Sequence, residues 1–376
     1  HTALQKKQFY LLTDDYHEKY ANFVESAAAD GLITVRDGII HKNRGRFTKV
    51  YDFHTIRKDN IIEVLRNEIE PLTALTRALD RICITPAWWI RRTLARRFID
   101  LDRKLFEDDY RKFYIKGETK PEEIGRPFFL KRFFSRRGII LIHGYMAAPE
   151  EIRPLADYLH KKGYNVYGAR LRGHGTAPED LASRNWEKWY DSVGRAYIIM
   201  KNTMKTIAIG GFSAGAGIAL LQAANKPGRF RGVISINAPL KLQNISSRLS
   251  SAVVMWNNFL TRIKISRGKM DFVTNTPENP HINYFRNPVA GVSELGKLMK
   301  VVEGRLLLVK DPALIMQGSD DPVVNPVSGL EIFDRLGTEQ KQLIRIYAKH
   351  HGIIRGREFE EVKARTLEFL KKVFSR

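Results

Sequence analysis

The residues with the clearest chemical potential form the pentapeptide Gly-Phe-Ser-Ala-Gly at 211–215, which fits the pattern G-x-S-x-G. This pattern is typical of a serine held at a sharp turn between a strand and a helix, where its hydroxyl is exposed. The pentapeptide alone is a weak signal, because roughly one chain in ten of this length carries it by chance. A β-branched run at 206–210 precedes it, however, and a helix-forming run at 214–224 follows it. We therefore predict that Ser213 is a nucleophile.

A serine hydroxyl needs a general base, and the base needs a carboxylate that orients it. In folds that use this serine turn, the acid and then the histidine follow the serine along the chain. Asp320 and Asp321 come just after one predicted strand, and His350 and His351 come just after the last one. Both pairs therefore lie at carboxyl ends of strands, where the sites of open α/β sheets form.

Each pair requires a choice. A Gly-x-x-Asp pattern favours Asp321 as the orienting acid, and Asp320 is then a turn-capping side chain. We favour His351 as the base, because Gly352 leaves room for its ring, and His350 is then a packed neighbour. The alternative for both histidines is a His-rich loop without a catalytic part.

A tetrahedral acyl intermediate also needs two backbone N–H donors. One would come from Ala214, which follows the nucleophile, and the other from Tyr145, in the loop after the first core strand. His143 and His174 are expected to be structural. No spacing of His, Cys and carboxylates indicates a metal site, and the Gly-x-Gly at 173–175 is a weak phosphate-binding signal. We expect no cofactor.

The elements that must position these residues form an α/β pattern. From Gly138 onward, short apolar runs alternate with helical patterns, which predicts a mostly parallel sheet flanked by helices. The predicted strands are 138–142, 165–170, 206–210, 232–236, 313–317 and 343–347. The predicted helices are 150–162, 186–204, 214–224, 326–336 and 358–374. Residues 239–289 break the alternation and predict a helical insertion followed by a Pro/Asn-rich loop.

Residues 1–137 show no such alternation, so we predict a mostly helical N-terminal extension of unassigned role and a catalytic domain at 138–376. The pieces 60–79 and 86–102 have helical patterns. The motif at 54–59 fits H-x-x-x-x-D of glycerolipid acyltransferases, but too little chain surrounds it to build that domain.

The helix that begins at Pro86 mixes tryptophans with arginine pairs. This composition suits an interfacial membrane helix. The alternative is a helix that packs its apolar side chains on the rest of the protein and turns its arginines outward.

Composition bounds the class of protein. With 376 residues, 43% of them hydrophobic, the chain can bury a large core, and a single cysteine excludes a disulfide scaffold. The net charge of +22 is spread over the chain and favours anionic partners such as phospholipid headgroups. No apolar run reaches the roughly 18 residues that cross a bilayer. We expect a cytoplasmic protein that can contact a membrane at its periphery.

Taken together, residues 138–374 resemble the α/β-hydrolase superfamily, and within it the bacterial carboxylesterase and monoacylglycerol lipase (serine aminopeptidase S33-like) group. The motifs that carry the resemblance are His-Gly-Tyr at 143–145, Arg-Gly-His-Gly at 172–175, Gly-Phe-Ser-Ala-Gly at 211–215, Gly-Ser-Asp-Asp at 318–321, and His351.

The resemblance implies that Ser213 is the nucleophile, His351 the base and Asp321 the orienting acid, with Tyr145 and Ala214 as oxyanion donors. It also implies that the insertion at 239–289 is a helical lid. Within that lid the candidate substrate-contacting residues are Met255, Trp256 and Phe259.

We therefore predict a serine hydrolase that cleaves a carboxylic ester of an acyl or lipid-like substrate through an acyl-enzyme. One alternative is acyl transfer or thioester hydrolysis by the same triad. Another is a non-catalytic, membrane-associated binding module. The expected partners are a small-molecule or lipid ester and an anionic membrane, without specific nucleic acid.

Overall fold

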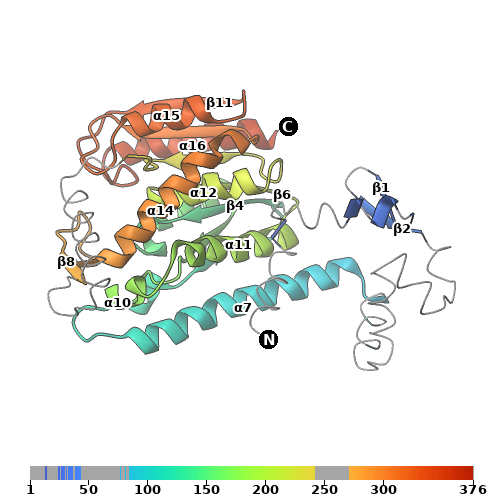
Figure 1. Cartoon of the computed structure of the whole chain (residues 1–376), viewed down its shortest axis with the longest axis horizontal. Helices are drawn as coiled ribbons and strands as arrows, with labels where there is room; N and C mark the ends of the chain where they lie inside the picture. The colour runs from blue at the N-terminus through green and yellow to red at the C-terminus, as the bar shows by residue number, and fades with distance from the viewer. Residues whose placement is uncertain are drawn as a thin grey trace, which may run out of the picture. The chain divides into compact units, whose positions relative to one another are not determined.

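The computed structural model describes residues 84–241 and 271–375, with scattered residues between 13 and 81 (Figure 1). Contacts divide the chain into two compact units, Asp14–Thr93 and Leu94–Arg376, with His1–Thr13 assigned to the larger one. The smaller unit contains an antiparallel hairpin of β1 (Ile33–Arg36) and β2 (Ile39–Lys42).

A seven-stranded sheet forms the centre of the larger unit, in the order β11-β10-β7-β6-β4-β5-β3 (Figure 1). All neighbouring pairs are parallel except β3, which runs antiparallel to β5 at one edge. The strands are β3 (Phe128–Leu130), β4 (Arg137–Ile142), β5 (Asn165–Ala169), β6 (Thr206–Phe212), β7 (Val233–Ile236), β10 (Ala313–Gly318) and β11 (Lys341–Ile346). The six predicted strands are thus confirmed, whereas β3 was not predicted because it is three residues long and lies outside the alternating region.

Helices cover both faces of the sheet, as the parallel pattern requires. The predicted helices are observed as α9 (Arg153–Lys161), preceded by a 3-10 turn at Pro149–Ile152, α11 (Trp186–Thr203), α12 (Ala214–Asn225), α15 (Val327–Arg335) and α16 (Glu358–Phe374). Four further elements were not predicted: α8 (Glu122–Gly125), α10 (Pro178–Ala182), α14 (Val289–Arg305) and the 3-10 turn Leu306–Leu308.

The core divides into two layers, because successive side chains of a strand point to opposite faces. Ile140 and Ile142 of β4 belong to the apolar cluster beneath α11, α12 and α14. Ile139 and Leu141 of the same strand belong to the cluster beneath α9 and α16. Both faces of β4 are therefore buried, which explains its continuous apolar run.

The described part of the insertion differs from the prediction. Residues 242–270, which include Met255, Trp256 and Phe259 of the predicted helical lid, lie outside the described residues. The following segment, predicted as loop, forms an antiparallel ribbon of β8 (Phe272–Thr274) and β9 (Arg286–Pro288). Three-residue strands are too short to produce a recognisable alternation, so only the loop between them was predicted.

Helix α7 (Ala87–Phe113) is longer than the predicted 86–102 and begins in the smaller unit. Near its start, Trp88 and Trp89 are 65% and 52% exposed, so neither side chain is buried. The predicted helix 60–79, apart from Arg77, and the motif at 54–59 lie outside the described residues. Within the described part of the chain, no helix is both long and apolar enough to cross a bilayer.

The rest of α7 is bound to the sheet through two buried aspartates. Asp102 accepts hydrogen bonds from the Tyr167 hydroxyl (2.7 Å) and from Arg195. Asp109 pairs with three guanidinium groups, those of Arg170 (2.8 Å), Arg172 (2.7 Å) and Arg184 (3.0 Å). Residues 94–113, assigned by sequence to the extension, are therefore part of the compact unit that carries the sheet.

Burial opposes ionisation of Asp109, but the adjacent Arg170 and Arg172 outweigh burial and hold the pKa of this carboxyl below its ordinary value. Removing a partner from such a buried cluster leaves uncompensated charge. Asp109→Ala is therefore expected to lower the free energy of unfolding by about 3–5 kcal/mol. The measurement is denaturant unfolding at neutral pH.

Asp108→Ala is the matched control, because Asp108 pairs with Arg111 at the surface, where both side chains are about half or more exposed. A loss below about 0.5 kcal/mol is expected there. Equal losses of unfolding free energy in the two variants would contradict the stabilising role of the buried Asp109 ion pairs.

Candidate active site

Ser213 lies at the turn between β6 and α12, with φ 53° and ψ −123°. This left-handed conformation is rare for a residue with a side chain and is typical of strained functional turns. The serine N–H donates to the Ile236 carbonyl at 2.8 Å, which fixes the turn against β7. A Cβ at Gly211 would lie 2.3 Å from the Gly215 carbonyl carbon, so the turn closes only because no side chain is present there.

Asp321 and His351 lie in the loops that follow β10 and β11. The Asp321 side chain is fully buried, and its Oδ2 is 2.7 Å from His351 Nδ1. Its Oδ1 accepts the N–H groups of Val323 (2.8 Å) and Val324 (2.9 Å). The carboxylate is thus fixed from both sides, and the histidine Nδ1 faces it.

The alternative members of each pair have other partners. Asp320 is exposed, and its carboxylate accepts a hydrogen bond from the Ser319 hydroxyl (2.7 Å). His350 Nε2 lies 3.1 Å from the Glu358 carboxylate. Of the two pairs singled out by the sequence, Asp321 and His351 are therefore the two that contact each other.

The backbone around His351 is held by two further side chains. Asn237 Nδ2 donates to the His351 carbonyl (2.8 Å), while Asn237 Oδ1 accepts the Gly318 N–H (2.8 Å). Glu278, in the loop between β8 and β9, accepts the N–H groups of His351 and Gly352, both at 3.0 Å. The ring of His351 packs on Phe212 with 4.8 Å between centroids.

The loop after β4 passes directly beside the serine. A Cβ at Gly144 would lie 3.3 Å from Ser213 Cβ, a contact tighter than most side chains make, so glycine suits this approach. The N–H of Ala214, at the first residue of α12, has no acceptor within the helix. Among the described residues, the N–H of Tyr145 also has no acceptor. Both predicted oxyanion donors are thus unoccupied by other described groups.

His143 and His174 are fully buried, as expected for structural residues. His143 Nδ1 lies 2.8 Å from the Gly144 carbonyl, and its Nε2 accepts the Leu171 N–H (3.2 Å). Burial lowers the pKa of His143 to about 4, so the ring is neutral and joins the loops after β4 and β5. Burial also lowers the pKa of His174.

Two acidic residues of the site were missed by the sequence analysis. Glu151, in the 3-10 turn before α9, is 8% exposed and its Oε2 accepts the Gly144 N–H (2.7 Å). Burial raises its pKa to about 7, although the Gly144 hydrogen bond and the charges of Arg355 and His351 favour the ionised form. Glu278 lies in the Pro/Asn-rich segment. Neither residue belongs to a recognisable motif: Glu151 binds a backbone N–H seven residues before it in the chain, and Glu278 binds backbone N–H groups more than 70 residues after it.

Ser213 and His351 line a cavity of about 950 Å³. Its apolar wall includes Met146, Val273, Val289, Val292 and Leu295, and its polar lining includes Asn275, Asn279, Asn283, Asn287 and Arg355. This size and composition suit a small organic ligand with an extended apolar part. Among the described residues, Ser213 Oγ and His351 form no hydrogen bond. Catalytic contacts of this kind are often long until substrate binds.

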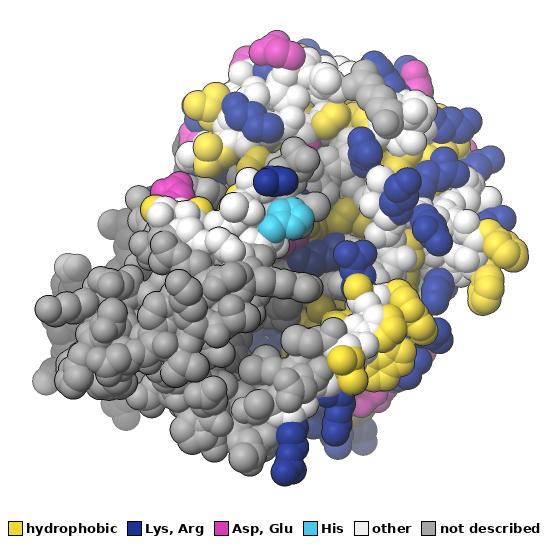
Figure 2. Space-filling model, turned by 90° about the vertical axis from the view of Figure 1, so that its right-hand side faces the viewer, with side chains coloured by type: hydrophobic (Ala, Val, Ile, Leu, Met, Phe, Trp, Pro, Cys, Tyr) yellow, Lys and Arg dark blue, Asp and Glu magenta, His cyan; other side chains and the backbone are white. Residues whose placement is uncertain are grey.

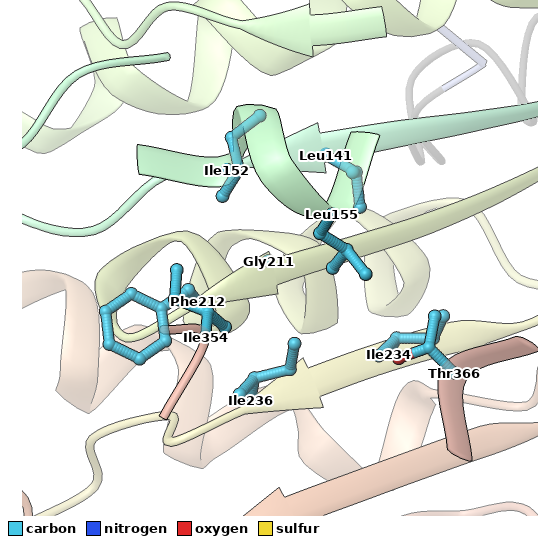
Figure 3. A pocket seen from close by; sticks show the side chains of 9 residues that line it. All are labelled: Leu141, Ile152, Leu155, Gly211, Phe212, Ile234, Ile236, Ile354 and Thr366. Carbon is cyan, nitrogen blue, oxygen red and sulfur yellow. The ribbon is translucent and has the colours of Figure 1, made fainter. Parts of the chain in front are cut away.

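A second void lies behind the serine turn, between the sheet and the helices α9 and α16 (Figure 3). It measures about 10 Å³ and is lined mainly by apolar side chains, including Leu141, Phe212 and Ile236. A void of this size holds at most one water molecule, so it is a packing gap and not a ligand site. Among the described residues, no group of three or more His, Cys, Asp and Glu could hold a metal ion.

The family model described as "Serine aminopeptidase, S33" matches residues 135–358, which is more than half of the chain. The chain belongs to this S33 family. The match covers the serine turn, the Asp321 loop and the His351 loop. The S33 assignment confirms the expected superfamily, and together with the lipase and carboxylesterase relatives below it confirms the expected enzyme class, an ester hydrolase.

Individual relatives agree with the S33 assignment. The chain is similar to the thermostable monoacylglycerol lipase of Bacillus sp. (strain H-257), with 29% identity over 238 residues, 62% of this chain and 90% of the relative. It is also similar to a carboxylesterase of Bacillus subtilis (strain 168), with 25% identity over 252 residues, 66% of this chain and 97% of the relative.

The fold is shared with a solved structure of one of the metagenome-derived lipolytic enzymes LipS and LipT. The TM-score is 0.58 at 24% identity, covering 68% of this chain and 98% of that one. At this identity the likeness establishes the α/β-hydrolase fold.

The buried carboxyl of Glu151 generates a prediction for stability against pH. Its pKa is about 7 in the folded protein against a reference value of 4.5. Between these values the folded state binds a proton that the unfolded state does not, so this group's contribution to stability falls as the pH rises from 4.5 through 7. Relative to Glu151→Gln, the wild type should lose roughly 3 kcal/mol over that range.

The measurement is the free energy of unfolding of both proteins at several pH values. Glu150→Gln is the control, because Glu150 is the adjacent, half-buried residue and does not contact Gly144. A difference between wild type and Glu151→Gln that stays constant with pH would refute the raised pKa.

Proposed function

We propose that this S33-family hydrolase cleaves the carboxylic ester of a lipid-like acyl substrate through Ser213, His351 and Asp321. The observation that carries the proposal is the 2.7 Å contact between His351 Nδ1 and the buried Asp321, with Ser213 and His351 lining one cavity. A carboxylate at Nδ1 fixes the tautomer whose Nε2 can accept the serine proton.

The chemistry runs in two halves. Ser213 Oγ attacks the ester carbonyl carbon while His351 Nε2 takes the hydroxyl proton, and the carbonyl oxygen becomes an oxyanion. The N–H groups of Tyr145 and Ala214 donate to that oxyanion. Collapse of the intermediate breaks the ester C–O bond, and His351 gives its proton to the leaving alcohol.

Water then enters the second half. His351 removes a proton from the water as it attacks the acyl-enzyme carbonyl, and the same two N–H groups bind the second oxyanion. Collapse of this intermediate returns the proton to Ser213 Oγ and releases the carboxylic acid. Asp321 does not take up the proton itself; its contact with Nδ1 stabilises the imidazolium that forms in each half.

The apolar cavity wall supports an acyl chain as the part of the substrate that is recognised. Met146, Val273 and Val289 line this wall, and we assign Met255, Trp256 and Phe259 of the insertion to the same role. The names of the two bacterial relatives, a monoacylglycerol lipase and a carboxylesterase, point to the same substrate class. The net charge of +22 suits association with anionic membranes, and a cytoplasmic location stays a prediction.

Acyl transfer or thioester hydrolysis would use the same residues. Product analysis separates these outcomes: glycerol added to an ester assay yields a new acylglycerol only if an alcohol competes with water for the acyl-enzyme. A binding module without catalysis would leave Ser213 unreactive towards a fluorophosphonate, which labels activated serines.

Ser213→Ala should lower kcat/KM for a p-nitrophenyl acyl ester by about four orders of magnitude or more, because the nucleophile is removed. Its melting temperature should be that of the wild type. Ser319→Ala is the control: this serine lies outside the cavity, where its hydroxyl contacts Asp320 and the Ala348 N–H (3.4 Å), and its turnover should stay within a few-fold of the wild type. Substantial turnover by Ser213→Ala would sink the proposed mechanism.

The assignment of the acid is tested by comparing Asp321→Asn with Asp320→Asn. Asp321→Asn should lower kcat by about 10⁴-fold, because the amide favours the wrong histidine tautomer. Asp320→Asn should stay within a few-fold of the wild type, because Asp320 contacts Ser319 and not His351. Steady-state kinetics on the same ester measure both; the reverse ranking would transfer the role to Asp320.

A further inference from the structure

The end of the sheet at which the parallel strands begin, that is, the side formed by their amino termini, carries a strongly basic surface. It consists of the described segments 131–137, 161–164, 204–205, 226–232, 306–312 and 337–340, which we call the amino-end surface. Its exposed cations are Lys131, Arg132, Arg136, Arg137, Lys161, Lys162, Lys205, Arg229, Arg231 and Lys310. Figure 2 views the molecule from this side, and Lys and Arg side chains gather over its described part.

Few carboxylates balance these cations. The same segments contain only Asp311, which is buried and accepts the N–H groups of Gly228 and Phe230, and Glu339, which is exposed. Among the described residues, none of the exposed cations of this surface forms an ion pair. The positive charge is therefore available to an external partner.

Two aromatic side chains project from this surface beside four of these cations. Phe133 and Phe134, in the loop between β3 and β4, are 91% and 96% exposed. Their rings pack edge-to-face on each other with 5.6 Å between centroids. Leu307 and Leu308, before β10, are also exposed at this end. Adjacent, almost fully exposed large apolar side chains are unfavourable in water and indicate an interaction site.

We propose that the amino-end surface docks the protein on an anionic phospholipid bilayer. Phe133 and Phe134 enter the boundary between headgroups and acyl chains, and the flanking cations Lys131, Arg132, Arg136 and Arg137 contact the headgroup phosphates. Apolar side chains at a tip surrounded by Lys and Arg are the composition of interfacial membrane anchors. Each cation near an anionic surface strengthens such binding severalfold.

The shape of the loop favours a bilayer over single-stranded nucleic acid. Nucleic-acid sites of that kind stack bases on aromatic faces along a basic groove. Here the rings of Phe133 and Phe134 pack against each other at the tip of a loop, which leaves no slot between them for a base.

This docking does not depend on the proposed hydrolysis, because the two sites are at opposite ends of the sheet. Ser213, Asp321 and His351 follow the carboxyl ends of their strands. A six-residue strand such as β4 spans about 20 Å. The cavity therefore faces away from the bound bilayer.

The test is flotation of the whole chain with phosphatidylcholine vesicles in which about one third of the lipid is phosphatidylglycerol. The wild type should bind these vesicles, and vesicles of phosphatidylcholine alone much more weakly. The double variants Phe133→Ser/Phe134→Ser and Arg136→Glu/Arg137→Glu should each lower the partition coefficient by about tenfold or more.

Matched control pairs lie elsewhere on the larger unit. Tyr114→Ser/Leu330→Ser removes two other exposed apolar side chains, and Lys112→Glu/Lys116→Glu reverses two exposed cations at the far end of α7. Both controls should bind vesicles within about twofold of the wild type, because substitutions away from the contact surface act independently of it. Ser213→Ala should bind like the wild type, so a failure of catalysis and a failure of docking are distinguishable.

Three results would overturn the proposal: unchanged vesicle binding by Phe133→Ser/Phe134→Ser, equal binding to neutral and anionic vesicles, or equal losses in the control pairs. Binding to single-stranded DNA that Arg136→Glu/Arg137→Glu abolishes, without vesicle binding by the wild type, would assign the surface to nucleic acid instead. Circular dichroism of every variant checks that the fold is intact.

Discussion

The site depends on how one buried carboxylate is held inside the protein. Asp321 has no exposed surface, and its two oxygens are divided between the His351 ring and two backbone N–H groups. A buried charge is tolerated only when it is paired and hydrogen-bonded. The loop after β10 supplies the amides, and the loop after β11 supplies the imidazole, so the parallel pairing of these two strands is a condition for the site. Asn237, after β7, joins the same loops from a third strand.

The central sheet and the serine turn were predictable because their signals are local. Each parallel strand is buried on both faces and therefore appears as a short apolar run, as at Ile139–Ile142. The glycines at 211 and 215 mark a turn that only small residues can close. The choice between Asp320 and Asp321, or between His350 and His351, depends on which side chain points inward, and the sequence favoured the pair that the structure brings into contact.

Features determined by distant contacts could not be predicted in this way. Glu151 has no motif around it. Only the folded structure shows that its Oε2 accepts a hydrogen bond from the Gly144 N–H at 2.7 Å. The strands β8 and β9 hold each other across a loop of eleven residues, with too few residues each to show a period. Helix α7 has a polar surface that looks solvent-exposed, yet Asp102 and Asp109 are buried by arginines from the other elements. Burial of charge by long-range pairing leaves no periodic pattern in the sequence.

The contact of Glu278 with the N–H groups of His351 and Gly352 joins the ribbon beside the cavity to the loop that carries the imidazole. A ligand that pushes this ribbon outward must stretch or break the two hydrogen bonds and so loosen the peptide from which the ring extends. Binding of a bulky ligand and the orientation of the His351 ring are therefore coupled through Glu278. A substrate that leaves the ribbon in place leaves both hydrogen bonds, and with them the position of the His351 backbone, unchanged.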